Sequence, residues 1–142
     1  MTTADGILRA MAEGRTVERG VNLAGDAENV DLPMPPSTNN LFATLGRRRV
    51  KSPEYRAWID SATPFAMTLR PVPTVPFGIT ITVVGCNPGS DIANREKAVV
   101  DLLVATKRIP GDSVRAGLHE IVMRYVECGE GESYVRIEMR SL

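Results

Sequence analysis

The chain has 142 residues, of which 43% are apolar and 24% charged, as expected of an ordinary globular domain with one core. Its formal net charge is zero, so the overall charge does not mark it as a nucleic-acid-binding protein. No apolar run reaches the roughly 18 residues that a transmembrane helix needs. The first residues, MTTADGILRAMAEGR, lack the basic start and apolar run of a signal peptide.

The charge is unevenly distributed along the chain. Residues 1–31 contain three arginines against six acidic residues, whereas residues 32–142 contain 14 basic against 11 acidic residues. The densest basic run is GRRRVK at 46–51. Such a run is most often a solvated loop, but a basic patch of this density can also bind an anionic polymer such as a nucleic acid. Both interpretations stay open.

The two cysteines, Cys86 and Cys128, are far apart and form no Cys-x-x-Cys or Cys/His cluster. This pattern argues against a structural zinc site and favours reduced thiols in a cytosol.

The first third of the chain predicts two short elements and an irregular loop. Residues 4–13 favour a short helix, and we interpret residues 1–29 as an N-terminal extension of a domain at 30–142. NVDLPM at 29–34 favours a strand, which the prolines of PMPPSTNN then end. Asn39 and Asn40 follow on this loop with short hydrogen-bonding side chains.

The rest of the chain predicts two helices and three strands. A helix over 52–67 is indicated by Ser52 at the N-cap and Pro53 at the first helical position, with Pro64 limiting or kinking it. FGITITVVG at 77–85 alternates as a strand, and residues 92–106 are helical. Residues 117–126 and 133–140 alternate as two further strands, joined by ECGEGE as a hairpin-like connection.

The resulting order β-α-β-α-β-β predicts the fold class. It indicates an α/β or α+β domain with a small mixed β-sheet and two packed helices.

Two aspartates flank the helix predicted at 92–106. Asp91 precedes it and Asp112 follows it, after a Pro-Gly turn. On a helical wheel, the positions not taken by large apolar residues form one stripe of small and polar residues, with Lys97 at its edge. This stripe consists of Asn94, Ala98, Asp101 and Ala105.

These residues also have ordinary interpretations, which stay open. Asp91 suits an N-cap, Asp112 suits a turn, and Lys97 with Asp101 suits an i,i+4 surface ion pair. Glu96 points about 160° away from the polar stripe on the wheel, so we set it aside.

The order of PMPPSTNN, SPEYRAW, DIANREKAVVDLL and IPGDS resembles the RusA family of Holliday-junction resolving endonucleases, over about residues 30–140. The resemblance implies a RusA-like fold, a homodimer, and cleavage of four-way DNA junctions with Mg²⁺, for which Mn²⁺ can substitute. It also implies a role in recombination and repair, in a cytoplasmic and non-membrane setting that includes phages or prophages.

The resemblance assigns roles residue by residue. Asp91, Lys97 and Asp112 match catalytic positions, Asp91 and Asp112 match metal ligands, and Asn94 and Asp101 match supporting positions. Ala93 stands where the family has a second aspartate. DNA would be contacted by Arg47, Arg48, Arg49 and Lys51, together with Asn39 and Asn40. We expect Asp91 and Asp112 to approach each other. The rival hypotheses are a junction-binding homologue with weakened or lost cleavage, and a scaffold protein that does not bind DNA.

Overall fold

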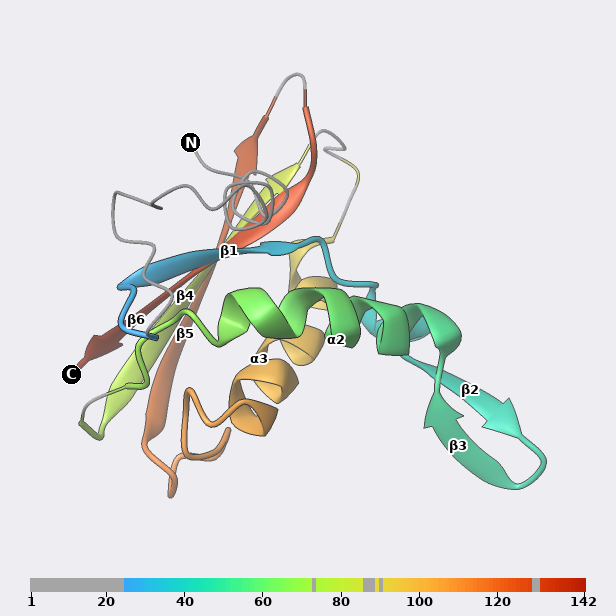
Figure 1. The fold of residues 1–142 in the computed structure, drawn as a ribbon, viewed down its shortest axis with the longest axis horizontal. Coiled ribbons are helices and arrows are strands. Elements are labelled where there is room, and N and C mark those ends of the chain that lie inside the picture. The colour runs from blue at the N-terminus through green and yellow to red at the C-terminus, as the bar shows by residue number, and fades with distance from the viewer. Residues whose placement is uncertain (1–24, 73, 86–88, 90, 129–130) are drawn as a thin grey trace.

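Six strands, two α-helices and two 3₁₀ turns occur in the part of the chain that the computed structural model describes, residues 25–72, 74–85, 89, 91–128 and 131–142 (Figure 1). They are β1 (Asn29–Pro33), η1 (Thr38–Asn40), β2 (Phe42–Leu45), β3 (Arg48–Lys51), α2 (Pro53–Ala66), β4 (Phe77–Gly85), η2 (Ile92–Arg95), α3 (Glu96–Ala105), β5 (Leu118–Glu127) and β6 (Tyr134–Ser141). The predicted order β-α-β-α-β-β is confirmed by β1, α2, β4, α3, β5 and β6, and the fold is of the mixed α+β class. The helix predicted at 4–13 lies outside the described residues.

The main sheet is mixed, with the strand order β1-β6-β4-β5. Strand β4 is parallel to β5 and antiparallel to β6, and β6 is antiparallel to β1. The sequence suggested that β5 and β6 form a hairpin, but β4 lies between them. The reason is that β4 is buried at every position except Thr82, and a strand that is buried on both faces lies in the interior of a sheet.

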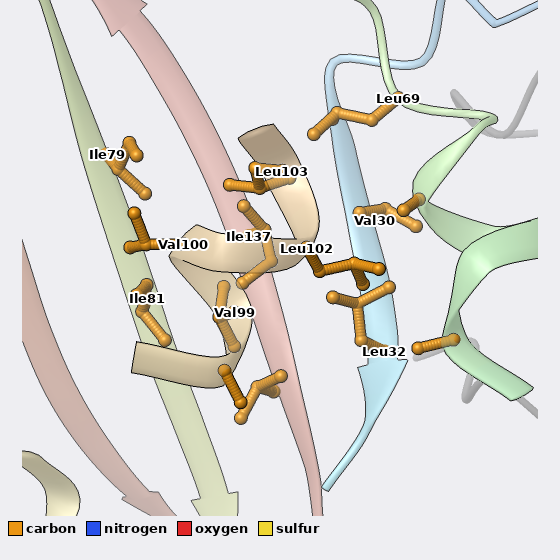
Figure 2. Packing of buried hydrophobic residues seen from close by; sticks show 14 of the residues in the cluster. Val30, Leu32, Leu69, Ile79, Ile81, Val99, Val100, Leu102, Leu103 and Ile137 are labelled. Carbon is orange, nitrogen blue, oxygen red and sulfur yellow. The ribbon is translucent and has the colours of Figure 1, made fainter. Parts of the chain in front are cut away.

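Helices α2 and α3 cover the same face of the sheet (Figure 1). Figure 2 shows apolar side chains of α3 among those of the sheet, with Val99, Val100, Leu102 and Leu103 facing Ile79, Ile81 and Ile137. Val30 and Leu32 of β1 extend this core towards α2. Burial of about ten large apolar side chains, each worth roughly 2 kcal/mol, therefore holds α3 against the sheet.

Helix α2 begins as its sequence predicts. The hydroxyl of Ser52 accepts a hydrogen bond from the backbone N–H of Tyr55 at 3.1 Å, and Pro53 occupies the first turn. Pro64 is accommodated inside the last turns, and the helix ends at Ala66. The indole Nε1–H of Trp58 donates to the carbonyl of Pro33 at 2.8 Å. This bond fixes α2 to the end of β1, where the proline-rich loop starts.

The face of the sheet opposite the helices carries charged residues. The guanidinium of Arg136 donates to both carboxylate oxygens of Asp31, at 2.8 and 3.1 Å, and Asp31 is only 4% exposed. Next to this pair, Arg140 bonds to Glu120 of β5 and to Thr80 of β4. Arg140 crosses β4 at Gly78, where a Cβ atom would meet its guanidinium at 2.9 Å. The glycine thus lets one long side chain join three strands.

Two further observations concern parts of the chain outside these layers. Ala27 is buried and forms a bridge to Leu69, so residues just before β1 contact the domain. Cys128 is disulfide-bonded, which contradicts the expectation of reduced thiols.

The two helices that the structure describes are too short or too polar to cross a membrane.

Replacing Arg136 with Ala should destabilise the domain strongly. Asp31 would be left in a buried position without its bidentate partner, which costs about 3 kcal/mol. Urea unfolding at pH 7 measures the effect. Arg56→Ala, an exposed arginine on α2, is the control and should change the unfolding free energy by less than about 0.5 kcal/mol. Equal values for the two variants would show that the ion pair does not contribute to stability.

Candidate functional site

The basic run GRRRVK is part of a β-hairpin, which was not predicted from the sequence. Strands β2 and β3 pair antiparallel, from Phe42 opposite Lys51 to Leu45 opposite Arg48. Gly46 has φ of +64°, while Arg47 has no positive φ, the pattern of a type II′ turn with glycine first. The hairpin projects away from the sheet and from both helices (Figure 1).

The hairpin is strongly basic and its charges are exposed. Arg47, Arg48, Arg49 and Lys51 are all exposed, and residues 41–51 contain no acidic residue. The guanidinium carbon of Arg49 lies 4.5 Å from the centre of the Phe42 ring, a cation–π contact that limits the motion of both side chains. The arm can therefore present positive charge to an anionic polymer.

The base of the hairpin is held by the first turn of α2. The hydroxyl of Ser52 donates to the carbonyl of Asn40 at 2.7 Å, and its backbone N–H donates to the carbonyl of Leu41 at 2.9 Å. Leu41 is fully buried, and the rings of Phe42 and Tyr55 meet edge to face at 5.9 Å. The same serine thus caps the helix and closes the hairpin.

The loop that precedes the hairpin contacts the segment that precedes α3. Thr38 donates through its hydroxyl to the carbonyl of Asn94 at 3.1 Å, and Arg95 donates to the carbonyl of Pro35. Asn40 is exposed and its amide donates to Ser37 at 3.1 Å, while Asn39 is also exposed. Two motifs that are distant in sequence, PMPPSTNN and DIANREK, are therefore adjacent in the fold.

Asp91 has the capping role that its position suggests. Its carboxylate accepts a hydrogen bond from the N–H of Ala93 at 3.1 Å and caps the 3₁₀ turn η2. The predicted helix at 92–106 is therefore a 3₁₀ turn followed by α3. The predicted ion pair between Lys97 and Asp101 is confirmed at 3.1 Å.

A cavity of about 380 Å³ lies between the hairpin base, α2, α3 and the loop after α3. Its polar lining includes Asp101 of α3, Asp112 of that loop and Lys51 of β3. Tyr55 and Phe42 provide aromatic walls. Burial, together with the charge of Asp101, raises the pKa of Tyr55. The fold thus brings together two of the sequence-predicted acids with one of the predicted basic residues.

Glu96, which the helical wheel set aside, belongs to the same electrostatic environment. Burial and then the charge of Asp101 raise its pKa above the ordinary value of 4.5, Lys97 opposes them, and the charge of Asp112 adds a smaller raising effect. Asp112 therefore folds back alongside α3 and comes within electrostatic range of the first residue of that helix. A wheel could not reveal this, because it contains no residue from outside the helix.

The geometry brings together only part of the predicted metal site. Asp112 and Asp101 line the cavity, whereas Asp91 is not among its lining residues. Within the described ranges, no group of three or more His, Cys, Asp or Glu residues is placed to hold one metal ion. The shared ion between Asp91 and Asp112 stays a prediction.

No protein-family model matches the chain, and no curated protein is significantly similar to it in sequence. The resemblance to the RusA family therefore rests on the order and spacing of the motifs.

Replacing Glu96 with Gln should stabilise the protein at neutral pH. Because the folded state holds the Glu96 proton more tightly than the unfolded state, the native free energy of unfolding falls as the pH rises from about 4.5 through the raised pKa. Glu96→Gln does not lose this stability, so its free energy of unfolding at pH 7 should exceed that of the native protein. The gain should be less than about 1 kcal/mol, because Glu96 is partly exposed. Near pH 4 the two proteins should converge.

Urea unfolding between pH 4 and 8 checks this effect of Glu96→Gln. The matched control is Glu54→Gln in the first turn of α2, which should lower stability slightly by removing a charge that favours a helix N-terminus. A loss of stability in both variants would contradict the unfavourable effect of burial and of Asp101 on the Glu96 carboxylate.

Proposed function

We propose that this protein is a Mg²⁺-dependent endodeoxyribonuclease that cleaves four-way DNA junctions in recombination and repair. The observation that carries the proposal is the position of a cavity with two aspartates in its lining, at the base of an exposed basic arm. Lys51 at the end of β3 lines the same cavity as Asp101 and Asp112. A DNA backbone bound by the arm would therefore be directed towards carboxylates, which is the arrangement that a metal-dependent nuclease needs.

The donor chemistry of the cavity fits Mg²⁺. This ion prefers hard oxygen ligands and keeps several waters, so one or two carboxylates are enough to hold it. Asp112 is exposed enough to bind it, and the carboxylate of Asp101 lines the same cavity. Asp112, which lines the cavity, is one proposed ligand, and the RusA resemblance adds Asp91, which lies outside the lining; Mn²⁺ would substitute at the same oxygens.

Hydrolysis of a phosphodiester requires an activated water and neutralisation of charge on the phosphate, and a bound Mg²⁺ supplies both. Lys97 and Lys51 would neutralise the phosphate charge further. Asp101 keeps Lys97 in place through their ion pair. The hydrogen bond from Thr38 to the carbonyl of Asn94 fixes the turn that carries Asp91 and Asn94. Asn39 and Asn40, exposed beside this turn, would contact the sugar-phosphate backbone.

Two opposed strands of a junction must be cut symmetrically, which a twofold dimer does without a second active site per chain. The proposal therefore includes a homodimer and a cytoplasmic location, in a cell or a phage-infected cell. The disulfide at Cys128 stands against that location, because a reducing cytosol disfavours disulfides.

A second candidate is a junction-binding homologue that no longer cleaves. It is favoured by Ala93, which replaces an acid of the RusA pattern, and by the lack of a three-carboxylate group among the described residues. This protein would keep the basic arm and its affinity for branched DNA.

Replacing Asp112 with Asn should lower Mg²⁺-dependent cleavage of a four-way junction by more than about tenfold, with binding to the junction retained. Loss of the carboxylate removes a proposed ligand without changing the size of the side chain. Nicking of a labelled junction across Mg²⁺ and Mn²⁺ titrations measures this loss. Asp60→Asn, an exposed acid on α2 outside the cavity, is the control.

The native chain decides between the candidates in the same assay. Metal-dependent nicking that Asp112→Asn weakens supports the enzyme. A native chain that binds junctions without nicking them supports the second candidate, and Ala93→Asp should then restore cleavage by adding a carboxylate near Asp91. A chain that neither binds branched DNA nor nicks it would leave the scaffold hypothesis.

The triple variant Arg47→Ala, Arg48→Ala, Arg49→Ala should bind junctions more weakly, with a flatter dependence on salt. Each lost phosphate contact lowers the slope of log K against log salt concentration by roughly one unit. The slope is obtained by measuring the junction-binding constant at salt concentrations from about 50 to about 200 mM. The control is Arg56→Ala, Arg115→Ala, Arg124→Ala, which removes the same charge from exposed sites outside the hairpin. Equal slopes for the two triple variants would exclude the hairpin as the DNA contact.

A further inference from the structure

The apex of the β2–β3 hairpin carries an exposed apolar residue among positive charges. Leu45 is 61% exposed and is the last residue of β2 before the turn. It pairs with Arg48 across the hairpin, and Arg47 is the second residue of the turn that follows it. A Cβ atom at Gly46 would meet nothing within 4 Å, so the apex stands clear of the domain (Figure 1).

The arm that carries Leu45 is anchored firmly at its base. Each strand has four residues and thus extends roughly 13 Å. The base is fixed to α2 by the contacts of Ser52 and by the edge-to-face contact of Phe42 with Tyr55. Within the hairpin, Arg49 of β3 packs over the Phe42 ring of β2. The apex is therefore carried by an arm whose base is packed against α2, and not by a loose loop.

These features match the design of DNA-bending proteins, in which an apolar side chain enters between base pairs while basic neighbours hold the phosphates. Such insertion costs a few kcal/mol per unstacked step in a continuous duplex. It costs less where the base pairs at a branch point are already unpaired or poorly stacked. An apolar apex would therefore favour a branched substrate over a linear one.

We propose that Leu45 is a wedge that inserts between bases at the centre of a branched DNA, with Arg47 and Arg48 binding the flanking phosphates. This inference rests on the proposed DNA-binding function and adds the means by which branched DNA is preferred. The arginines give affinity for any duplex, and Leu45 supplies the preference for the branch. Insertion of Leu45 needs no metal. The inference therefore holds both for an enzyme that cleaves junctions and for a homologue that binds them without cleaving.

The test uses a four-way junction with 2-aminopurine at the branch point, a base whose fluorescence rises when it is unstacked. The native chain should raise this fluorescence on binding, in buffer without divalent metal. Leu45→Ala should abolish the rise and weaken junction binding by about tenfold, the effect of losing contacts of part of a leucine side chain. Its affinity for a linear duplex of equal length should stay unchanged. Leu45→Phe, which keeps an apolar wedge, should retain the rise.

The matched control is Met67→Ala, an exposed apolar residue (46%) beyond the other end of α2, which should leave both signals unchanged. A native chain that binds the junction without a change in fluorescence, or a Leu45→Ala variant that keeps the full rise, would overturn the wedge and leave the proposed function standing. A native chain that fails to bind the junction would overturn both.

Discussion

The burial of β4 on both faces is the constraint on which the rest of the structure depends. A strand of this kind must have neighbours along both edges and layers on both sides. Strands β5 and β6 occupy the edges, and α3 covers one face. The other face is closed by long polar side chains, of which Arg140 can cross the strand only because residue 78 is glycine. The positions of β5, β6 and α3 thus follow from the burial of one strand.

The candidate site inherits its geometry from that arrangement. Helix α3 is fixed on the sheet by its apolar face, so its polar stripe is turned away from the sheet, towards α2 and the hairpin base. Asp101 lies on this stripe, and the loop after α3 returns Asp112 to the same cavity. Ser52, which caps α2 and bonds to Asn40, determines where the basic arm leaves the domain. The acids and the arm are therefore positioned by different elements that share α2.

Local patterns in the sequence predicted the elements whose signals are local. Pro53 with the Ser52 cap predicted the start of α2, and the alternation in FGITITVVG predicted β4. The ion pair of Lys97 with Asp101 followed from i,i+4 spacing. The β2–β3 hairpin was missed because its strands have only four residues and its turn is Gly-Arg, without the Asn-Gly signal of common hairpins. Its dense charge also favoured a loop.

Relations between elements were not accessible from the sequence. Placement of β4 between β5 and β6 depends on a competition among pairings, and adjacency in the chain favoured the wrong one. The interaction of Glu96 with Asp112 depends on the path of the loop after α3, which carries no periodic signal. Asp91 illustrates the opposite case, since a cap is a contact with the next residues and can be recognised locally.

The pairing of β1 with β6 has a consequence for synthesis of the protein. Asp31 and Arg136 are separated by 105 residues, and β6 is the neighbour of β1 in the main sheet. A growing chain therefore exposes β1, α2 and the apolar β4 well before β6 leaves the ribosome to join them. Closure of the sheet is a late, non-local event, which slows folding. Until then the edges of β4 are unpaired, and unpaired strand edges are where partly folded chains associate with one another.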